Sequence, residues 1–443
     1  MEELLGGEYP AFSASLGEAS LRALRVNAAK MSPADFAAHY GTPLRSVPYA
    51  PNAYYCPDEK PGRHPYHAAG VYYVQDPGAM AALAGVPALS GLICLDLCAA
   101  PGGKTTQLAE RIGKDGYLLA NEINTPRCRI LQGNIERMGC DNVAVCNSDS
   151  KSLAKEYPDF FDFILVDAPC SGEGMFRKYE IAETEWSEEN VRICAARQTE
   201  ILEDAAKMLA EDGRILYSTC TFSLEENEMQ IDAFLSRHPE FTLSPFDAAV
   251  CEATADGIAF AGAAHPDLLL LSRRFYPHLA KGEGQFFALL SKSGGVTRRR
   301  SADPVRFTAE ERRLCDDFIK KNLDLPKEIF LRLYDGTPYL TRVELSLPRH
   351  RVFSPGVILG SFERGRIEPH HQLFSAYGYC FKRKLSLTKD DPRVAKYLAG
   401  ETLAVEGLSN GYAAVLIDGA PIGGVKIVDG VAKNHYPRGL RVR

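Results

Sequence analysis

The sequence has 443 residues, of which 45% are hydrophobic and 24% charged, and its formal net charge at pH 7 is −6. This composition is that of an ordinary soluble protein with room for about two to four domains, because single hydrophobic cores stop growing near ~250–300 residues. No apolar run approaches the ~18–20 residues of a membrane span, which excludes a membrane partner. The acidic start, Met1-Glu2-Glu3, lacks a signal-peptide pattern, so we expect a cytoplasmic protein.

Charge and cysteine spacing restrict the partners further. The net acidity counts mildly against a nucleic-acid partner, although Arg298-Arg299-Arg300 and residues 433–443 are locally basic. The 12 cysteines contain no C-x-x-C pair, which argues against a structural zinc site and against a disulfide scaffold. We therefore expect no bound metal.

The chain is predicted to contain four domains. They are a small N-terminal accessory domain, an α/β domain, a linker with an intermediate domain, and a C-terminal β-rich module, over residues 1–70, 71–293, 294–388 and 389–443. In the first, helices are expected over Leu16–Lys30 and Ser32–His39, the second capped by Ser32. The segment from Pro43 to Pro65 is rich in Pro and Tyr and is expected to be irregular.

The α/β domain is predicted from short apolar runs that alternate with helical patterns. The expected strands are Gly70–Pro77, a run beginning at Leu92, Tyr117–Asn121, Val143–Cys146, Phe160–Val166, Gly213–Ser218 and Gln285–Leu290. The expected helices are Gly78–Gly85, Lys104–Arg111, Arg127–Met138, Ile193–Leu209 and Glu225–Arg237. This alternation is typical of a mostly parallel, doubly wound Rossmann-like sheet.

The last third of the chain changes character. After a basic linker over Thr297–Asp303, the pattern predicts a helix in Pro304–Leu325, short strands in Lys327–Arg383 and a helix over Lys389–Leu398. Strands at 411–417 and 421–428 are each followed by Asp-Gly, which is a strong signal for β-hairpin turns.

The segment Cys98-Ala99-Ala100-Pro101-Gly102-Gly103-Lys104 follows the first central strand and opens a helix. Strand, glycine turn and helix form the first half of a nucleotide-binding unit, in which glycines let the backbone approach the ligand. The adjacent glycines match neither G-x-x-x-x-G-K-[ST] nor G-x-G-x-x-G, which disfavours a phosphate loop and a nicotinamide cofactor. The alternative is an ordinary tight turn.

Acidic residues follow the next strands. Glu122, Asp149 and Asp167 each stand at or just after a predicted strand end, and Glu122 lies about 20 residues past the glycines, where a carboxylate takes ribose hydroxyls. Because carboxyl ends of parallel strands meet at one edge, these residues favour a ligand that carries ribose and adenine.

Two thiols, Cys170 and Cys220, lie in polar loops at the same edge. Close to Lys104 and to helix N-termini, both are expected to have lowered pKa values and to be reactive. Packing is the alternative for any single cysteine, and metal binding would need nearby histidines that these loops lack.

A cytosine substrate would explain two thiols beside an adenine-type cofactor. A thiolate that adds to C6 makes C5 enamine-like and able to accept a methyl group from S-adenosylmethionine. A base must then remove the C5 proton, and the attacking thiol must leave. Asp167 can hold the N3 edge of the ring, and the second thiol can assist release.

The region 70–290 resembles the RNA cytosine-5 methyltransferases of the NOL/NOP/Sun group. The matching strings are Cys98–Lys104, Asp167–Gly172, Tyr217–Cys220 and Arg274–His278 with Gly282–Gly284. The resemblance implies that Cys220 is the nucleophile, that Cys170 aids product release, and that Lys104 and Asp167 complete the catalytic site. It also implies that S-adenosylmethionine contacts Cys98–Lys104, Glu122, Asp149 and Asp167.

The flanks narrow the resemblance. Leu24–Asn27 resembles the N-terminal region of the family, and Lys433–Pro437 with Gly439–Arg441 resembles the PUA-like RNA-binding domain of the bacterial RsmF subgroup. That subgroup implies 16S rRNA, in the decoding region of the small ribosomal subunit, as the partner. The alternatives are the same reaction on tRNA or another RNA, or a non-catalytic rRNA-binding assembly factor, which the intact cysteine pair disfavours.

Overall fold

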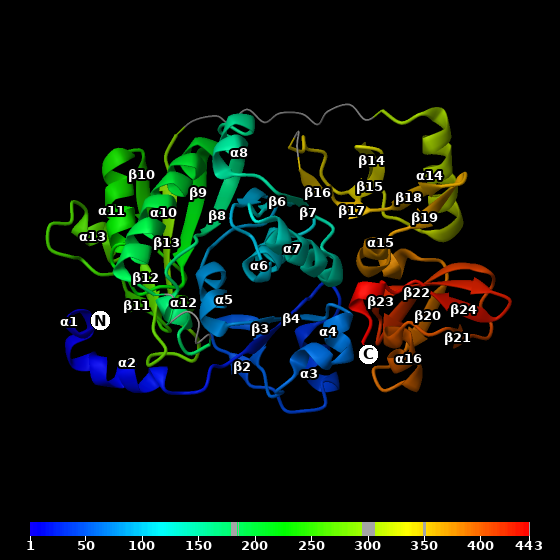
Figure 1. Ribbon diagram of the computed structural model, residues 1–443, viewed down its shortest axis with the longest axis horizontal. Helices are drawn as coiled ribbons and strands as arrows, with labels where there is room; N and C mark the ends of the chain where they lie inside the picture. The colour runs from blue at the N-terminus through cyan, green and yellow to red at the C-terminus, as the bar shows by residue number, and fades with distance from the viewer. Residues whose placement is uncertain (179–183, 185, 295–305, 349–350, 443) are drawn as a thin grey trace.

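The computed structural model describes residues 1–178, 184, 186–294, 306–348 and 351–442. The predicted basic linker Thr297–Asp303, with Arg298–Arg300, lies outside the described residues. Figure 1 shows the N-terminal segment in blue beneath a central sheet, and the C-terminal strands in orange and red beside them. Among the helices of the described segments, none is long and apolar enough to span a membrane.

The central sheet has the order β11-β12-β13-β9-β8-β5-β6-β7-β16, with β10 paired to β13. Its parallel strands are β5 (Ile93–Asp96), β6 (Tyr117–Asn121), β7 (Val143–Cys146), β8 (Phe161–Asp167) and β9 (Leu209–Thr219). Strands β10 (Phe241–Ser244), β11 (Ala255–Asp256), β12 (Arg273–Phe275) and β13 (Gln285–Lys292) add an antiparallel edge. The strand order reverses direction between β5 and β8, which is where such sheets bind ligands.

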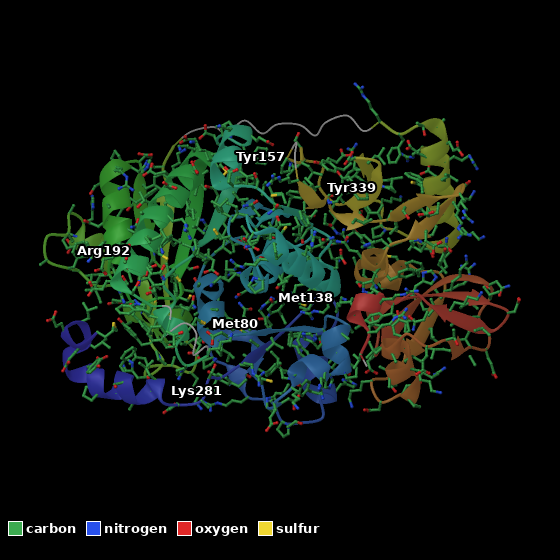
Figure 2. All side chains as sticks on the ribbon, in the orientation of Figure 1. Met80, Met138, Tyr157, Arg192, Lys281 and Tyr339 are labelled. Carbon is green, nitrogen blue, oxygen red and sulfur yellow. The ribbon has the colours of Figure 1, made fainter. Side chains whose placement is uncertain are left out.

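Helices cover both faces of this sheet, as predicted. One core cluster contains side chains of α5 (Pro77–Ala84), α6 (Gly103–Ile112) and α7 (Thr125–Met138). Met80 and Met138 are both buried and lie near the N-terminal segment (Figure 2). The other face packs on α8 (Ser150–Glu156), α10 (Glu188–Met208) and α11 (Glu228–Arg237). Short helices α12 (Ala248–Cys251) and α13 (Pro266–Leu269) flank the antiparallel edge.

The N-terminal segment corrects the predictions made for it. It contains α1 (Glu2–Leu5), α2 (Tyr9–Leu16), α3 (Pro33–His39), α4 (Pro65–Ala68) and a sheet of order β2-β3-β1-β4, with strands at Ser46–Val47, Ala50–Tyr55, Ala23–Val26 and Tyr72–Gln75. The helix predicted over 16–30 is wrong, because β1 is buried between β3 and β4 and this long-range pairing overrides local propensity. The segment predicted to be irregular contains β2 and β3.

Two local predictions were made for this segment, a helix capped by Ser32 and a strand over residues 70–77, and both elements are present. Helix α3 is capped by Ser32, whose hydroxyl accepts the Asp35 N–H at 3.1 Å, as predicted. The strand expected over 70–77 exists as β4, but it pairs with β1 and so belongs to the N-terminal sheet.

The C-terminal third begins with α14 (Ala309–Asn322), whose N-terminus is capped by a capping box of Thr308 and Glu311. It continues with β14 (Phe330–Tyr334), β15 (Thr337–Thr341), β16 (Val352–Ser354), β17 (Val357–Ile358), β18 (Gly360–Glu363), β19 (Arg366–Pro369), α15 (His371–Tyr377), β20 (Lys384–Leu387) and α16 (Pro392–Ala399). The last sheet adds β21 (Leu403–Ala404), β22 (Gly411–Ile417), β23 (Ala420–Val428) and β24 (Val431–Asn434). Both predicted Asp-Gly turns are present, with Asp418 at φ 47° and Gly419 at φ 84°.

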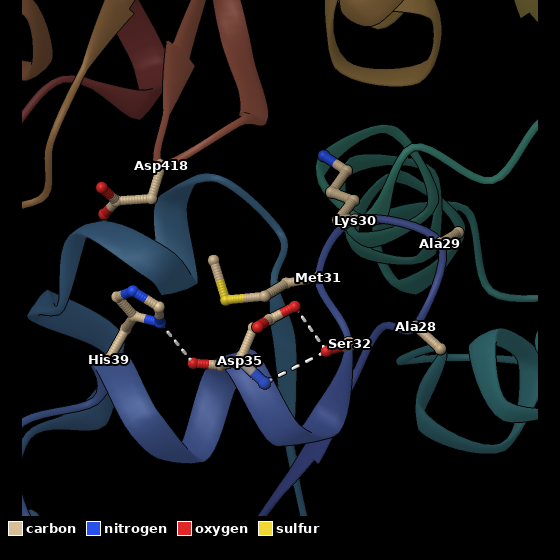
Figure 3. Close-up of a pocket in the computed structure, with 8 residues that line it drawn as sticks. All are labelled: Ala28, Ala29, Lys30, Met31, Ser32, Asp35, His39 and Asp418. Atoms are coloured by element: carbon tan, nitrogen blue, oxygen red, sulfur yellow. Dashed lines mark hydrogen bonds between the residues drawn. The ribbon is translucent and has the colours of Figure 1, made fainter.

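Several contacts join the segments that were predicted as separate domains. One hydrophobic core combines side chains of β1 and α3 with those of β20 to β24. Lys30 Nζ donates to the carbonyl oxygens of Ala69, Arg137 and Pro421 at 2.6–3.1 Å. Beside it, a cavity of about 330 Å³ lies between the loop after β1, helix α3 and Asp418 (Figure 3). Strand β16, from the predicted intermediate domain, also pairs with β7 of the predicted α/β domain. The division into four domains therefore stays a prediction.

Candidate active site

The loop after β5 is held in place from the side of α7. Arg127 Nη2 donates to the Ala100 carbonyl at 2.7 Å, and Asn134 Nδ2 donates to that of Pro101 at 2.9 Å. Gly102 has a φ of +112°, and a Cβ there would lie 3.2 Å from Leu131 Cδ1, so the turn requires glycine. Helix α6 begins at Gly103, directly after this turn, so the backbone N–H groups of its first turn lie beside the strand ends.

A cavity of about 1430 Å³ runs along the carboxyl ends of β5 to β9. It brings together nearly all the side chains and loop residues that the sequence analysis singled out. Lining residues from that prediction are Cys98, Ala99, Ala100, Pro101, Gly103, Lys104, Glu122, Asp149, Asp167, Cys170 and Cys220. Gly102, the turn residue between Pro101 and Gly103, is not among the residues that line this cavity in the described structure. The volume exceeds the ~300–1,000 Å³ of a typical small-molecule pocket, which leaves room for a ligand and part of a polymer.

The acidic residues occupy distinct positions in this cavity. Glu122 is buried, accepts the Asn124 N–H at 2.8 Å and lies 3.6 Å from Arg127 Nη1. Asp149 caps α8, and hydrogen bonds from Ser152 hold the pKa of its carboxyl below the ordinary value. Both therefore present carboxyl groups to a ligand at the edge formed by β6 and β7.

Asp96, the last residue of β5, was missed by the sequence analysis. Its Oδ2 accepts the Thr105 hydroxyl at 2.7 Å, whereas its buried Oδ1 has no hydrogen-bond partner among the residues that the structure describes. Burial raises the pKa of this carboxyl to about 7. Its acidic character at the end of an apolar strand is the same signal that identified Asp167.

Lys104 and Asp167 form an ion pair at the centre of the cavity. Lys104 Nζ lies 2.7 Å from Asp167 Oδ1, which also accepts the Ser218 hydroxyl at 2.8 Å. Burial alone would lower the pKa of Lys104, but the Asp167 carboxylate raises it above its ordinary value. Lys104 Nζ also donates to Gln285 Oε1 at 3.3 Å, because β13 is antiparallel and begins at this edge. The site therefore holds a fixed ammonium–carboxylate pair.

The two thiols meet beside this pair. Cys170 Sγ and Cys220 Sγ are 3.1 Å apart, and the Cys220 backbone N–H points at Cys170 Sγ at 3.3 Å. The hydrogen bond from the Cys170 S–H, aided by Lys104, lowers the pKa of Cys220 despite burial. The same hydrogen bond, together with burial, raises the pKa of Cys170 well above its ordinary value. The expectation of two lowered pKa values is therefore wrong for Cys170, since one proton is shared between two buried sulfurs.

Residues outside the predicted set fix the two cysteine loops. Glu226 is fully buried, and its carboxylate accepts the Ser171 N–H at 3.0 Å and Gln198 Nε2 at 2.7 Å. The loops are also joined directly, since the Gly174 N–H donates to the Cys220 carbonyl at 2.9 Å. These contacts link distant parts of the chain, so local sequence patterns could not have revealed them.

Family comparisons match the chain in three places. Residues 88–291 match "16S rRNA methyltransferase RsmB/F", residues 1–77 match "N-terminal domain of 16S rRNA methyltransferase RsmF", and residues 384–442 match "Methyltransferase RsmF PUA domain". The first match contains the whole set of predicted site residues.

Relatives and solved structures agree with this. Ribosomal RNA small subunit methyltransferase F of Klebsiella pneumoniae is 31% identical over 95% of this chain and 90% of the relative. The protein of that name from Vibrio vulnificus is 30% identical over 95% of this chain and 91% of the relative. A methyltransferase homologue from Pyrococcus horikoshii matches with a TM-score of 0.56 and 26% identity, covering 65% of this chain and 91% of that structure. NSun6 from the same organism, solved with SFG, shares the fold at a TM-score of 0.56 and 21% identity, over 66% of this chain and 97% of its own. With near-full-length relatives at this identity, the chain belongs to the ribosomal RNA small subunit methyltransferase F family, whose members use S-adenosylmethionine.

Proposed function

We propose that this chain transfers a methyl group from S-adenosylmethionine to C5 of cytosine in 16S rRNA, in the decoding region, and that it acts in the cytoplasm. The observation that carries the proposal is the 3.1 Å pair of Cys170 and Cys220 beside the Lys104–Asp167 ion pair. C5 of cytosine is not nucleophilic until C6 has been attacked, and a thiolate is the side chain suited to that attack.

The residues at the strand ends fit the cofactor. Glu122 would hold the ribose hydroxyls, Asp149 would lie beside the adenine, and the loop 98–104 would approach the ligand through its backbone. The Oδ1 atom of Asp96 is buried and has no hydrogen-bond partner among the described residues, so it can accept a hydrogen bond from the ligand. When bound, S-adenosylmethionine supplies an electrophilic methyl group next to the base.

Cys220 begins the reaction on the base. Its thiolate adds to C6, so the Sγ–C6 bond forms, the C5–C6 double bond opens, and its electron pair develops at C5, which takes the methyl group. Asp167 holds the N3 edge of the ring, and the Lys104 ammonium, 2.7 Å from Asp167 Oδ1, keeps this side chain in place. The lowered pKa of Cys220 increases the thiolate fraction at a given pH.

Cys170 acts when the product leaves. The C5 proton passes to a base in the cavity, the C5–C6 double bond forms again, and the C6–Sγ bond breaks with its electron pair on Cys220. Cys170 keeps its own proton because its pKa is raised. Its S–H can therefore donate to the departing thiolate across 3.1 Å and make Cys220 a better leaving group.

The RNA target is tested directly by mapping the modified base. Relatives over nearly the whole chain are named for small-subunit rRNA, which supports this substrate. Small-subunit rRNA from a strain that lacks the enzyme is incubated with protein and cofactor, and 5-methylcytosine is located by bisulfite sequencing. Modification of tRNA in preference to rRNA would replace the proposed substrate, and methylation of neither would leave an assembly factor as the better account.

Glu122→Ala is expected to weaken binding of S-adenosylmethionine about 10- to 100-fold in calorimetry. The carboxylate would lose a charge-assisted hydrogen bond to ribose worth ~1.5–3 kcal/mol. Glu136→Ala is the matched control, because this half-buried acid lies in the neighbouring helix α7 but does not line the described cavity. Wild-type affinity of Glu122→Ala would reject its assignment to the ribose.

The C-terminal strands are expected to raise RNA affinity. Lys433 and Arg438 are exposed there, whereas the module shares its core with β1 and α3, so a truncation would also disturb folding. The double substitution Lys433→Gln/Arg438→Gln should raise the RNA KM several-fold and reduce the salt dependence of binding by about one unit per lost phosphate contact. Lys114→Gln, an exposed site after α6, is the control. An unchanged KM would mean that these side chains do not contact RNA.

A further inference from the structure

We propose that Arg25, in β1 of the N-terminal sheet, is a positioning residue for the cofactor loop, so that affinity for S-adenosylmethionine depends on the N-terminal segment. This inference rests on the proposed cofactor site. Arg25 is 1% exposed, and its guanidinium donates to acceptors on β4 and α6. These are Gln75 Oε1 at 2.9 Å, Glu110 Oε2 at 2.9 Å, Thr106 Oγ1 at 2.6 Å and the Gly103 carbonyl at 3.2 Å.

The contact with Thr106 sets the direction of a hydrogen-bond relay. A guanidinium can only donate, so the Thr106 hydroxyl accepts from Arg25 and its single proton is free for another acceptor. That acceptor is the Gly102 carbonyl at 2.8 Å. Gly102 is the residue with φ +112° at the turn into α6. Arg25 therefore acts, through Thr106, on the backbone of the loop that faces the cavity.

The N-terminal sheet also forms a wall of the same cavity. Tyr73, Val74 and Gln75 of β4 line it. A Cβ on Gly103 would lie 3.4 Å from Tyr73 Cε1, so the loop packs closely on this strand. On the opposite side, Arg127 holds the Ala100 carbonyl. The loop is thus fixed between α7 and the N-terminal sheet. Arg25 supplies the charged contact from the N-terminal sheet.

Loss of Arg25 should reduce cofactor affinity more than it reduces the chemical step. A loop released from one side must be ordered again when the ligand binds, and this cost appears in the dissociation constant. Glu110 would keep its hydrogen bond from Asn52 Nδ2 at 3.0 Å, so the carboxylate is not left without any partner. Once the cofactor is bound, Lys104, Asp167 and both thiols regain their arrangement.

The experiment measures S-adenosylmethionine affinity of the full chain by calorimetry, together with kcat and both KM values. Arg25→Met is expected to weaken the affinity for S-adenosylmethionine about tenfold and Thr106→Val several-fold. Arg25→Lys should weaken it by an intermediate factor, because lysine retains the positive charge but not the several N–H donors of the planar guanidinium. The cofactor KM should rise in parallel, while kcat at saturation and the RNA KM change less than about twofold. Arg342→Met is the control, since this partly buried arginine pairs with Asp141 at 2.6 Å and does not line the described cavity.

The outcomes separate this inference from the proposed function. Unchanged affinity in Arg25→Met and Thr106→Val, with a wild type that binds, overturns the positioning role and leaves the proposed function standing. An equal loss in Arg342→Met also overturns it, because the effect would then be general destabilisation. A wild type that does not bind S-adenosylmethionine overturns the cofactor site and this inference together. If Arg25→Met does not fold, Thr106→Val decides by the same criterion.

Discussion

Cys220→Ala is expected to reduce methyl transfer about a thousandfold or more and to form no covalent complex with RNA. Without the thiolate, C6 is never attacked and C5 never becomes nucleophilic, whatever the cofactor occupancy. The measurement is incorporation of labelled methyl groups into rRNA under single-turnover conditions. Affinity for S-adenosylmethionine should stay within about twofold of wild type, because the proposed cofactor contacts lie on other strand ends.

A matched variant controls for the loss of a thiol as such. Cys56→Ala removes a half-buried thiol of the N-terminal segment that donates to the Asp58 carbonyl and does not line the described cavity. It should retain full activity. Near-wild-type methylation by Cys220→Ala would remove the nucleophile from the proposed mechanism, even if the RNA target were correct.

Cys170→Ala is expected to attack the base and transfer the methyl group, but to release product slowly. The departing Cys220 thiolate would lose the S–H donor 3.1 Å away, so the C6–Sγ bond breaks less readily and the adduct accumulates. Adduct formation should also shift to higher pH, because the same hydrogen bond is the main cause that lowers the pKa of Cys220. Denaturing electrophoresis of protein with labelled RNA over a pH series measures both effects.

An alternative distribution of roles would give a different pattern. If Cys220→Ala traps RNA and Cys170→Ala does not, the nucleophile and the releasing thiol are exchanged. If both variants keep activity and neither traps RNA, the covalent mechanism is wrong. Cys170→Ser is informative beside Cys170→Ala, since a hydroxyl at this position can still donate and should release product faster than alanine does.

The central strands and the C-terminal turns could be predicted because their signals are local. A short apolar run such as Val143–Cys146 is typical of a strand that is buried on both faces of a parallel sheet. The dipeptide Asp418-Gly419 by itself predicts a hairpin turn. Strand β1 could not be predicted in this way. Ala23–Val26 is a strand because β3 and β4 pair with it from both sides, and β4 is about 50 residues further along the chain.

In the candidate site, too, the features with local sequence signals could be predicted, and those that depend on long-range contacts could not. Loop residues, acidic strand ends and both thiols could be assigned from motifs at predicted strand ends, and the structure brings them to one cavity. The opposite pKa shifts of Cys170 and Cys220 depend on a distance between two loops that are 50 residues apart, so the sequence alone suggested lowered pKa values for both thiols. Arg25 and Glu226 were missed for the same reason, because their partners are distant in the chain.

The most direct test of the covalent mechanism uses Cys170→Ala with small-subunit rRNA and S-adenosylmethionine labelled in its methyl group. The trapped complex is isolated by denaturing electrophoresis, digested with nuclease and protease, and examined by mass spectrometry. The mechanism predicts a methylated cytosine nucleotide attached to the peptide that contains Cys220, and no such species in Cys170→Ala/Cys220→Ala. Attachment at another residue, or a double variant that still traps RNA, would contradict it.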